Sequence, residues 1–222
     1  MKKYIIANWK SNKTLTEVRF WLDNFPHNEE SKRALLNLEI IIAPPYPFLA
    51  LAKEIIERRH LAIKLAVQDL SAFGSGAYTG EVAAFNLQDL SVEYAILGHS
   101  ERRRFLSENS QLISDKVNEA LDWQIKPILC LDQSYFAEQA RFLKNSALSQ
   151  CLLAYEPVSA IGSGQAEAAG NLLKIRQQLA PLYKQNTLIY GGSVNADNVG
   201  SYLKVCDGVL LGGASLDLKN FI

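Results

Sequence analysis

A single carboxylate, Glu156, directly follows the apolar run Cys151–Tyr155, and Pro157 comes next. A carboxylate at the end of a buried strand destabilises the fold unless it is paired or hydrogen-bonded. Few purely structural roles therefore explain an acid at this position. Carboxylates whose proton affinity is perturbed in this way are characteristic of functional sites. Glu156 is therefore the first candidate for acid or base chemistry in this chain.

Further polar residues also close apolar runs, and they are Asn8, Lys10, Gln68, Asp69, His99, Ser100 and Glu101. Several of them have a structural alternative. Lys10 could be a solvated loop lysine, and His99 could be a core histidine bonded to the backbone. Glu101 could belong to an exposed ion-pair cluster with Arg102–Arg104.

Two apolar runs near the C-terminus end in glycine instead. The first is followed by Gly191, Gly192 and Ser193, and the second by Gly212 and Gly213. A glycine pair before a helix presents bare backbone N–H groups, which suit a phosphate or carboxylate. Each pair alone could be a tight turn, but two pairs on consecutive strands favour a ligand that carries a phosphate.

The elements that position these residues alternate along the whole chain. Eight short apolar runs are expected to be strands: Tyr4–Trp9, Leu38–Ala43, Ala62–Gln68, Glu93–Gly98, Pro127–Leu131, Cys151–Glu156, Thr187–Tyr190 and Gly208–Leu211. The segments between them are expected to be helices: Thr14–Phe25, Pro47–Arg59, Asn86–Ser91, Asn109–Trp123, Ser134–Asn145, Ala166–Tyr183, Asn195–Leu203 and a short one from Ser215. This alternation predicts an α/β fold.

Nearly continuous apolar strands indicate a parallel sheet covered on both faces. Such a sheet is either open and doubly wound or closed into a (β/α)₈ barrel. No GxGxxG motif follows the first strand, which ends in ANWKSN, so the dinucleotide-binding fold lacks its usual phosphate loop. We therefore expect one TIM-barrel domain over residues 1–222, with the chemistry at the carboxyl ends of the strands.

Composition limits the partners. Lys plus Arg and Asp plus Glu each number 23, so the formal net charge is zero and no basic face suggests nucleic acid. The three cysteines lie inside apolar runs without CxxC spacing, which favours free thiols in a reducing, cytoplasmic compartment. No run approaches the ~18 apolar residues that indicate a membrane span, so we expect neither a membrane nor a nucleic-acid partner.

Seven motifs, in order along nearly the whole chain, resemble triosephosphate isomerases. They are ANWK at Ala7–Lys10, GAYTGE at Gly76–Glu81, ILGHSERR at Ile96–Arg103, AYEPV at Ala154–Val158, AIGSG at Ala160–Gly164, YGGSV at Tyr190–Val194 and LGGASL at Leu211–Leu216. The resemblance implies interconversion of dihydroxyacetone phosphate and D-glyceraldehyde 3-phosphate in glycolysis and gluconeogenesis, with no metal or organic cofactor.

The resemblance also implies roles for individual residues. Glu156 would be the base that moves the proton between neighbouring carbons, and His99 the neutral group that polarises the carbonyl. These two roles, and a loop that closes over the site, are the family's known mechanism and do not follow from spacing. Lys10 would supply positive charge, Asn8 would orient the substrate oxygens, and Glu101 would lie in an acid network near Lys10. Phosphate contacts would come from Gly162, Ser193, Gly212 and Gly213.

The same resemblance predicts a homodimer. The exposed, glycine-rich loop Gly74–Glu81 would insert into a second subunit, and its Thr79 would reach the neighbouring active site. Arg102 and Glu108 resemble a structural ion pair of the family, and we expect them to take no part in the chemistry.

Two features depart from the family pattern. After Cys130 the family usually continues with Gly and Glu, whereas this chain reads Leu131–Gln133 and then reaches Glu156 early. We therefore expect a trimmed region after the fifth strand. Ser159 stands where the family commonly has Trp in the loop that follows the base, so we expect altered closure of that loop.

Competing functions fit the residues less well. A metal-dependent epimerase would need several His and Asp ligands at strand ends, and a Schiff-base aldolase would need a lysine deep on a central strand. A barrel that only binds metabolites would be expected to have lost Lys10, His99 or Glu156, and all three are present.

Overall fold

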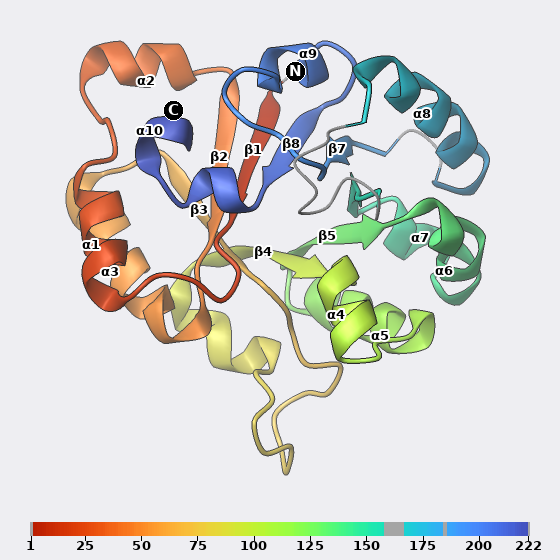
Figure 1. The fold of residues 1–222 in the computed structure, drawn as a ribbon. Coiled ribbons are helices and arrows are strands. Elements are labelled where there is room, and N and C mark those ends of the chain that lie inside the picture. The colour runs from red at the N-terminus through yellow and green to blue at the C-terminus, as the bar shows by residue number, and fades with distance from the viewer. Residues whose placement is uncertain (1, 158–166, 184–185, 222) are drawn as a thin grey trace.

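The structure is a computed structural model that describes residues 2–157, 167–183 and 186–221 (Figure 1). In these residues eight parallel strands close into a barrel in the order β1 to β8. Their bounds are β1 Lys3–Asn8, β2 Leu38–Ala43, β3 Ile63–Val67, β4 Val92–Leu97, β5 Lys126–Leu131, β6 Leu152–Tyr155, β7 Leu188–Tyr190 and β8 Gly208–Leu211. The predicted (β/α)₈ barrel is confirmed, and β2 and β8 have the predicted bounds.

The strands bury side chains on both faces, as their apolar composition requires. One cluster fills the barrel interior and includes Ile6, Ile41, Ile96, Ile128 and Leu210. Alternate residues of the same strands join the larger layer between the barrel and the helices, where Ala7, Ile42 and Leu129 lie. Successive side chains along a strand point alternately into the barrel and toward the helices. The position of a residue at a strand end therefore determines which of these two directions its side chain takes.

The helices surround the barrel (Figure 1). The α-helices are α1 Leu15–Asp23, α2 Glu29–Leu35, α3 Leu49–Arg59, α4 Ser100–Phe105, α5 Ser110–Asp122, α6 Phe136–Phe142, α7 Asn145–Leu148, α8 Ala169–Tyr183, α9 Val199–Leu203 and α10 Leu218–Phe221. The 3₁₀ helices are η1 Tyr46–Phe48, η2 Ala84–Leu90, η3 Gln133–Tyr135 and η4 Gly213–Ser215. Among the described helices, none is long and apolar enough to cross a membrane.

Two of the observed helices were not expected from the sequence, and one expected helix is divided. Helices α2 and α4 could not be predicted from periodicity, because neither EESKRAL nor SERRRF has the apolar spacing of an amphipathic helix. The segment expected as one helix over Ser134–Asn145 is divided into η3, α6 and α7, and Leu143 between α6 and α7 is extended. The described helical pieces in the connection between β5 and β6 are therefore short, the longest being α6 Phe136–Phe142.

Helix α1 anchors the end of β1. Thr14 caps it through a capping box with Glu17, and Trp21 packs edge-on against Trp9 with ring centroids 5.1 Å apart. Both indoles are almost fully buried. Trp9 lies between Asn8 and Lys10, so this packing fixes the strand end that carries both candidate residues.

A buried ion-pair network holds α4 against α5 and the end of β3. Lys116 Nζ lies 2.5 Å from Glu108 Oε1 and 2.7 Å from Asp69 Oδ2, and Arg102 bridges the same two acids at 2.8 and 2.6 Å. Burial would raise the pKa of Glu108, but hydrogen bonds from Lys116 and Arg102 outweigh it and lower that pKa. At Asp69 burial dominates and raises the pKa. The expected Arg102–Glu108 pair is thus one half of a four-residue network.

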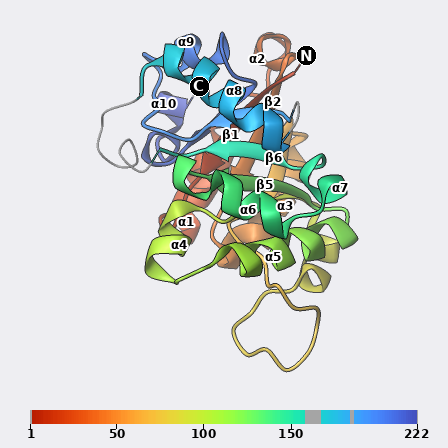
Figure 2. The ribbon, with the colours of Figure 1, turned by 90° about the vertical axis from the view of Figure 1, so that its right-hand side faces the viewer.

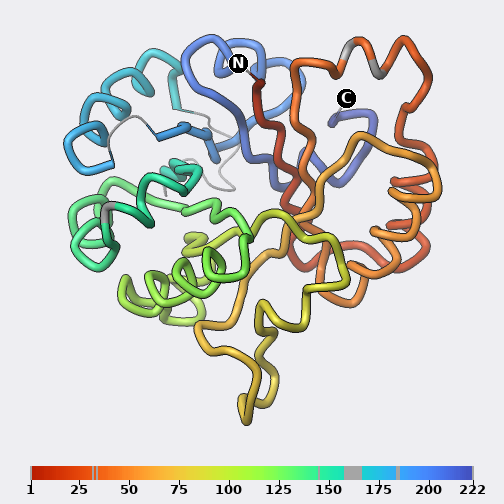
Figure 3. The backbone as a smooth tube through the Cα atoms, turned by 180° about the vertical axis from the view of Figure 1, so that it is seen from behind, coloured from red at the N-terminus to blue at the C-terminus, as the bar shows by residue number. Residues whose placement is uncertain are grey.

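Residues 71–83, which form most of the connection between β3 and η2, extend away from the barrel. Figures 1, 2 and 3 show it as a long loop beyond α4 and α5. Near its tip the rings of Phe73 and Tyr78 stack, with centroids 4.5 Å apart and planes 10° apart. Thr79 lies on this loop and is exposed. The loop therefore presents an aromatic surface that its own barrel does not cover.

Candidate active site

Glu156 occupies the first position after β6, at the carboxyl end of the barrel. Its backbone N–H donates to Leu131 O at 2.8 Å, which continues the strand pairing by one residue. Its side chain is 2% exposed. Oε1 lies 3.3 Å from His99 Nε2, and Oε2 accepts a 3.3 Å hydrogen bond from Ser100 N. The buried carboxylate therefore faces the start of α4.

Two neighbours shape the space around this carboxylate. A Cβ at Gly191 would lie 2.8 Å from Glu156 Cγ, so only glycine fits after β7 without displacing the acid. Burial, with the Glu156 carboxylate close by, raises the pKa of the Cys130 thiol well above its ordinary value. The thiol is therefore neutral and adds no second negative charge beside Glu156.

His99 is the N-cap of α4 and is almost completely buried. Its Nδ1 accepts a 3.2 Å hydrogen bond from Glu101 N in the first turn of that helix. A ring nitrogen that accepts a backbone N–H carries no proton, so in the neutral imidazole the hydrogen is on Nε2. Nε2 is the nitrogen that faces Glu156, and it can donate a hydrogen bond to an oxygen placed there.

Lys10 follows β1 in a left-handed backbone conformation, with φ of 50°, which costs free energy for a residue other than glycine. Side chains from two strand ends hold it there. Asn8 Oδ1 accepts from Lys10 N at 3.0 Å, and Gln68 Nε2 donates to both Lys10 O at 2.9 Å and Ala43 O at 2.8 Å. This backbone directs the Lys10 ammonium into the site.

The Lys10 ammonium lies between an acid and a glycine. Nζ is 2.5 Å from Glu101 Oε1, and the position of a Cβ on Gly212 would be 3.2 Å from Lys10 Cε. The Glu101 side chain is 40% exposed, so water also solvates it. Lys10 therefore lies at the mouth of the site in an ion pair that is partly exposed to solvent.

A cavity of about 280 Å³ joins these side chains to the glycine-rich strand ends. Its lining includes Lys10, His99, Glu156, Gly191, Gly192, Ser193, Gly212 and Gly213. Gly213 begins η4, and Asn198 Nδ2 fixes the turn by donating to Ser193 O at 3.0 Å. An adjoining cavity of about 500 Å³ shares Lys10 and Glu156 and extends between α4 and the end of β5. The acid, the histidine and the glycine-rich turns thus border one space.

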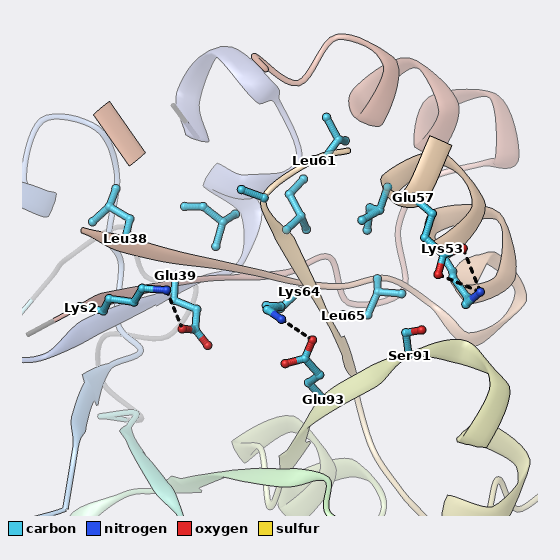
Figure 4. Close-up of a pocket in the computed structure, with 14 residues that line it drawn as sticks. Lys2, Leu38, Glu39, Lys53, Glu57, Leu61, Lys64, Leu65, Ser91 and Glu93 are labelled. Atoms are coloured by element: carbon cyan, nitrogen blue, oxygen red, sulfur yellow. Dashed lines mark hydrogen bonds and ion pairs between the residues drawn. The ribbon is translucent and has the colours of Figure 1, made fainter. Parts of the chain in front are cut away.

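Another cavity, of about 370 Å³, lies at the opposite end of the barrel, between α3 and the starts of β2 and β3 (Figure 4). Its charged side chains pair with one another, as Lys2–Glu39, Lys53–Glu57 and Lys64–Glu93. None of the residues that the sequence analysis selected for chemistry lines this cavity. We therefore place the candidate active site at the carboxyl end.

The structure brings together most of the residues selected from the sequence. Those that border or brace the carboxyl-end cavities are Asn8, Lys10, His99, Glu101, Glu156, Ser193, Gly212 and Gly213. Thr79 does not line them. Gly162 and Ser159 lie outside the described residues. Gln68 and Ser100 were predicted only as strand-end residues, and both bond to groups of the site, Gln68 to Lys10 O and Ser100 to Glu156 Oε2. The close approach of Gly191 to Glu156 has no signal in the sequence.

The chain matches known proteins over its whole length. The family model described as triosephosphate isomerase matches residues 3–222. A relative named triosephosphate isomerase from Mesomycoplasma hyopneumoniae strain 7448 is 36% identical over 238 residues, which cover 100% of this chain and 97% of the relative. Proteins of the same name from Thermus thermophilus and Dictyoglomus turgidum are 36% and 34% identical, with 97% of each relative covered.

Proposed function

Because this chain belongs to the triosephosphate isomerase family and interconverts dihydroxyacetone phosphate and D-glyceraldehyde 3-phosphate, we propose that Glu156, His99 and Lys10 carry out the reaction. The single observation that supports this most strongly is the 3.3 Å approach of Glu156 Oε1 to His99 Nε2 beside the cavity of the glycine-rich turns. In this arrangement Glu156 as the base and His99 Nε2 as a hydrogen-bond donor would both face a small substrate in the cavity.

Glu156 takes the proton from the carbon next to the carbonyl. A carboxylate is a weak base in water, and removal of its hydration shell strengthens it toward a C–H proton. Burial of Glu156 to 2% exposure supplies that environment. As the C–H bond breaks, its electron pair forms the enediolate, and Glu156 then returns the proton to the neighbouring carbon.

His99 and Lys10 stabilise the enediolate that this step creates. Nε2–H of the neutral His99 donates to the carbonyl oxygen and can pass its proton between the two oxygens. The Lys10 ammonium adds a positive charge beside both the enediolate and the phosphate. Donors already aimed at the developing charge need no reorganisation, which is the largest catalytic contribution in many enzymes. Asn8 and Glu101 hold Lys10 in position, and Asn8 also orients the substrate oxygens.

The glycine-rich turns bind the phosphate. Gly212, Gly213 and Ser193 line the cavity with Lys10, and backbone N–H groups in such turns bind anions without the bulk of side chains. Gly162 would add a further N–H contact. No residue of the proposed mechanism requires a metal ion or an organic cofactor.

A coupled assay tests this function. The purified protein is expected to convert D-glyceraldehyde 3-phosphate to dihydroxyacetone phosphate, and 2-phosphoglycolate, an analogue of the phosphorylated enediolate, is expected to inhibit competitively. Inhibition that does not compete with substrate would place the phosphate site elsewhere, and absence of turnover would contradict the activity.

We further propose that the protein is a cytoplasmic homodimer whose subunits exchange the loop Gly74–Glu81. The stacked rings of Phe73 and Tyr78 are each 46% exposed, and large exposed apolar surface favours burial against a partner. Phe105, the last residue of α4, and Leu106, which follows it, are 67% and 59% exposed and offer an apolar surface close to the active site. Thr79 of each loop would reach the partner's site. The described cysteines are free and buried, which suits a reducing compartment.

Replacing Tyr78 by Asp is expected to convert the dimer into a monomer of 24.7 kDa with reduced kcat, because the new charge would be buried at the subunit interface. Sedimentation velocity measures the mass, and the coupled assay measures kcat. Phe142→Asp is the matched control, since Phe142 on α6 is similarly exposed, at 45%, but lies outside the loop. A parent protein that sediments as a fully active monomer would contradict the proposal.

A further inference from the structure

Glu167, the first described residue after the 158–166 segment, is held by three tyrosines. Its carboxylate Oε2 accepts from Tyr155 OH at 3.0 Å. Its backbone N–H donates to Tyr190 OH at 2.9 Å, and its carbonyl accepts from Tyr202 OH at 2.7 Å. The carboxylate, the N–H and the carbonyl of this one residue are therefore bound by hydroxyls from β6, β7 and α9.

Two of these tyrosines immediately precede residues of the active site. Tyr155 precedes Glu156, and Tyr190 precedes Gly191. Glu156 and Gly191 face each other inside the site, where a Cβ on Gly191 would lie 2.8 Å from Glu156 Cγ. The strand ends are also joined by the 2.8 Å bond from Gly191 N to Tyr155 O.

Tyr155 and Tyr190 lie on the other face of the same strand ends, and Tyr202 on α9 packs there with them. Tyr155, Tyr190 and Tyr202 belong to the layer between strands and helices, and side chains alternate along a strand, so Glu156 points the opposite way. Tyr190 stacks on Tyr202 with centroids 4.4 Å apart, and Tyr155 packs against Phe136 at 6.0 Å. Burial, together with the Glu167 carboxylate, raises the pKa of Tyr155, so its hydroxyl remains a neutral donor.

Two contacts of the Glu156 carboxylate with described residues are long. Its contacts to His99 Nε2 and Ser100 N are both 3.3 Å, whereas N–H to O bonds cluster near 2.9–3.0 Å. They leave room for the carboxylate to shift. The direction of Glu156 therefore depends strongly on how firmly the backbone at Tyr155 is fixed, and the Tyr155–Glu167 bond fixes that backbone from outside the barrel.

We propose that Glu167 is a positioning residue for the reaction: by binding the Tyr155 hydroxyl it holds the end of β6 so that the Glu156 carboxylate is aligned for proton transfer. This inference rests on the proposed role of Glu156 as the base. Glu167 lines neither of the carboxyl-end cavities that the described residues enclose, so we infer that its effect passes through Tyr155.

The test uses the full-length protein and four variants, Glu167→Ala, Glu167→Gln, Tyr155→Phe and the double variant Glu167→Ala/Tyr155→Phe. Displacing a catalytic group by a fraction of an ångström is expected to lower kcat by about tenfold in Glu167→Ala and in Tyr155→Phe. The KM and the inhibition constant of 2-phosphoglycolate are expected to change less than about twofold, because the phosphate cavity is intact. Loss of packing alone would not separate kcat from inhibitor binding in this way.

Two comparisons sharpen the result. The double variant is expected to have the kcat of the single variants, because both remove the same bond. Glu167→Gln retains an oxygen that can accept from Tyr155, so its kcat is expected to stay within about threefold of the parent. Glu93→Gln, at the opposite end of the barrel, controls for loss of a surface acid and is expected to leave kcat unchanged.

A parent-like kcat in Glu167→Ala or Tyr155→Phe would overturn the proposal, as would losses that multiply in the double variant. If Glu167→Ala does not fold, Tyr155→Phe carries the test, since it deletes only a hydroxyl. Glu156→Gln is assayed in parallel. An inactive Glu156→Gln with a fully active Tyr155→Phe refutes the positioning role alone, whereas an active Glu156→Gln refutes the base assignment as well.

Discussion

Replacing Glu156 by Gln is expected to lower kcat by about 10²- to 10⁴-fold, the contribution typical of a positioned general base. The amide keeps the size of the side chain and can still accept from Ser100 N, which now bonds Oε2 at 3.3 Å. It also fits beside Gly191, where no Cβ competes for space. The amide lacks the basic carboxylate oxygen that accepts the proton. The fall in kcat therefore reports the loss of the general base and not a change in packing.

The fold of this variant is expected to survive. Removing a buried negative charge at 2% exposure relieves a desolvation cost, so the unfolding temperature should not fall. Titration with 2-phosphoglycolate should still show binding through Lys10 and the glycine-rich turns. Glu93→Gln serves as the control for a changed acid far from the site. A Glu156→Gln protein with a kcat near that of the parent would remove Glu156 from the mechanism.

Replacing Lys10 by Met is expected to lower kcat/KM by about 10²- to 10³-fold, comparable to removal of an oxyanion donor. Lys10 is the one Lys or Arg among the described residues that line the cavity of the glycine-rich turns. The enediolate and the phosphate are both anionic, so loss of this charge weakens the transition state and the bound substrate together. Steady-state kinetics should therefore show a lower kcat and a higher KM.

Methionine is the appropriate replacement at this position. Lys10 has φ of 50°, and Met carries the same backbone strain as Lys, so the substitution changes the charge and not the conformational cost. Glu101, left without its partner, has a side chain that is 40% exposed and is solvated by water. Lys64→Met, in an exposed ion pair at the other end of the barrel, is the matched control. Equal kcat/KM values for the two variants would contradict the assignment.

The strands could be predicted because each is apolar on both faces. That pattern is local in sequence, and it predicts a parallel sheet. It also locates the strand ends where Asn8, His99 and Glu156 lie. Helix α4 could not be predicted in the same way. Its sequence SERRRF has no apolar periodicity, and it is held by the His99 cap and by the pairing of Arg102 with Asp69 and Glu108.

Contacts between residues distant in sequence account for what was missed at the site. Lys116 lies on α5 where a lysine would usually be solvated, yet it is buried against Asp69 and Glu108. Glu167 is likewise an ordinary acid in the sequence, and only the closed barrel brings Tyr155, Tyr190 and Tyr202 to it. Spacing along the chain carries no signal for such contacts.

The most direct test of the proposed mechanism is proton exchange in D₂O, followed by NMR of the triose phosphates. The parent protein is expected to incorporate deuterium from solvent at the carbon that receives the proton. In Glu156→Gln, which retains the phosphate site, incorporation and isomerisation should both be slower than in the parent by about 10²- to 10⁴-fold. Deuterium incorporation by Glu156→Gln at the rate of the parent would contradict the claim that Glu156 carries the proton.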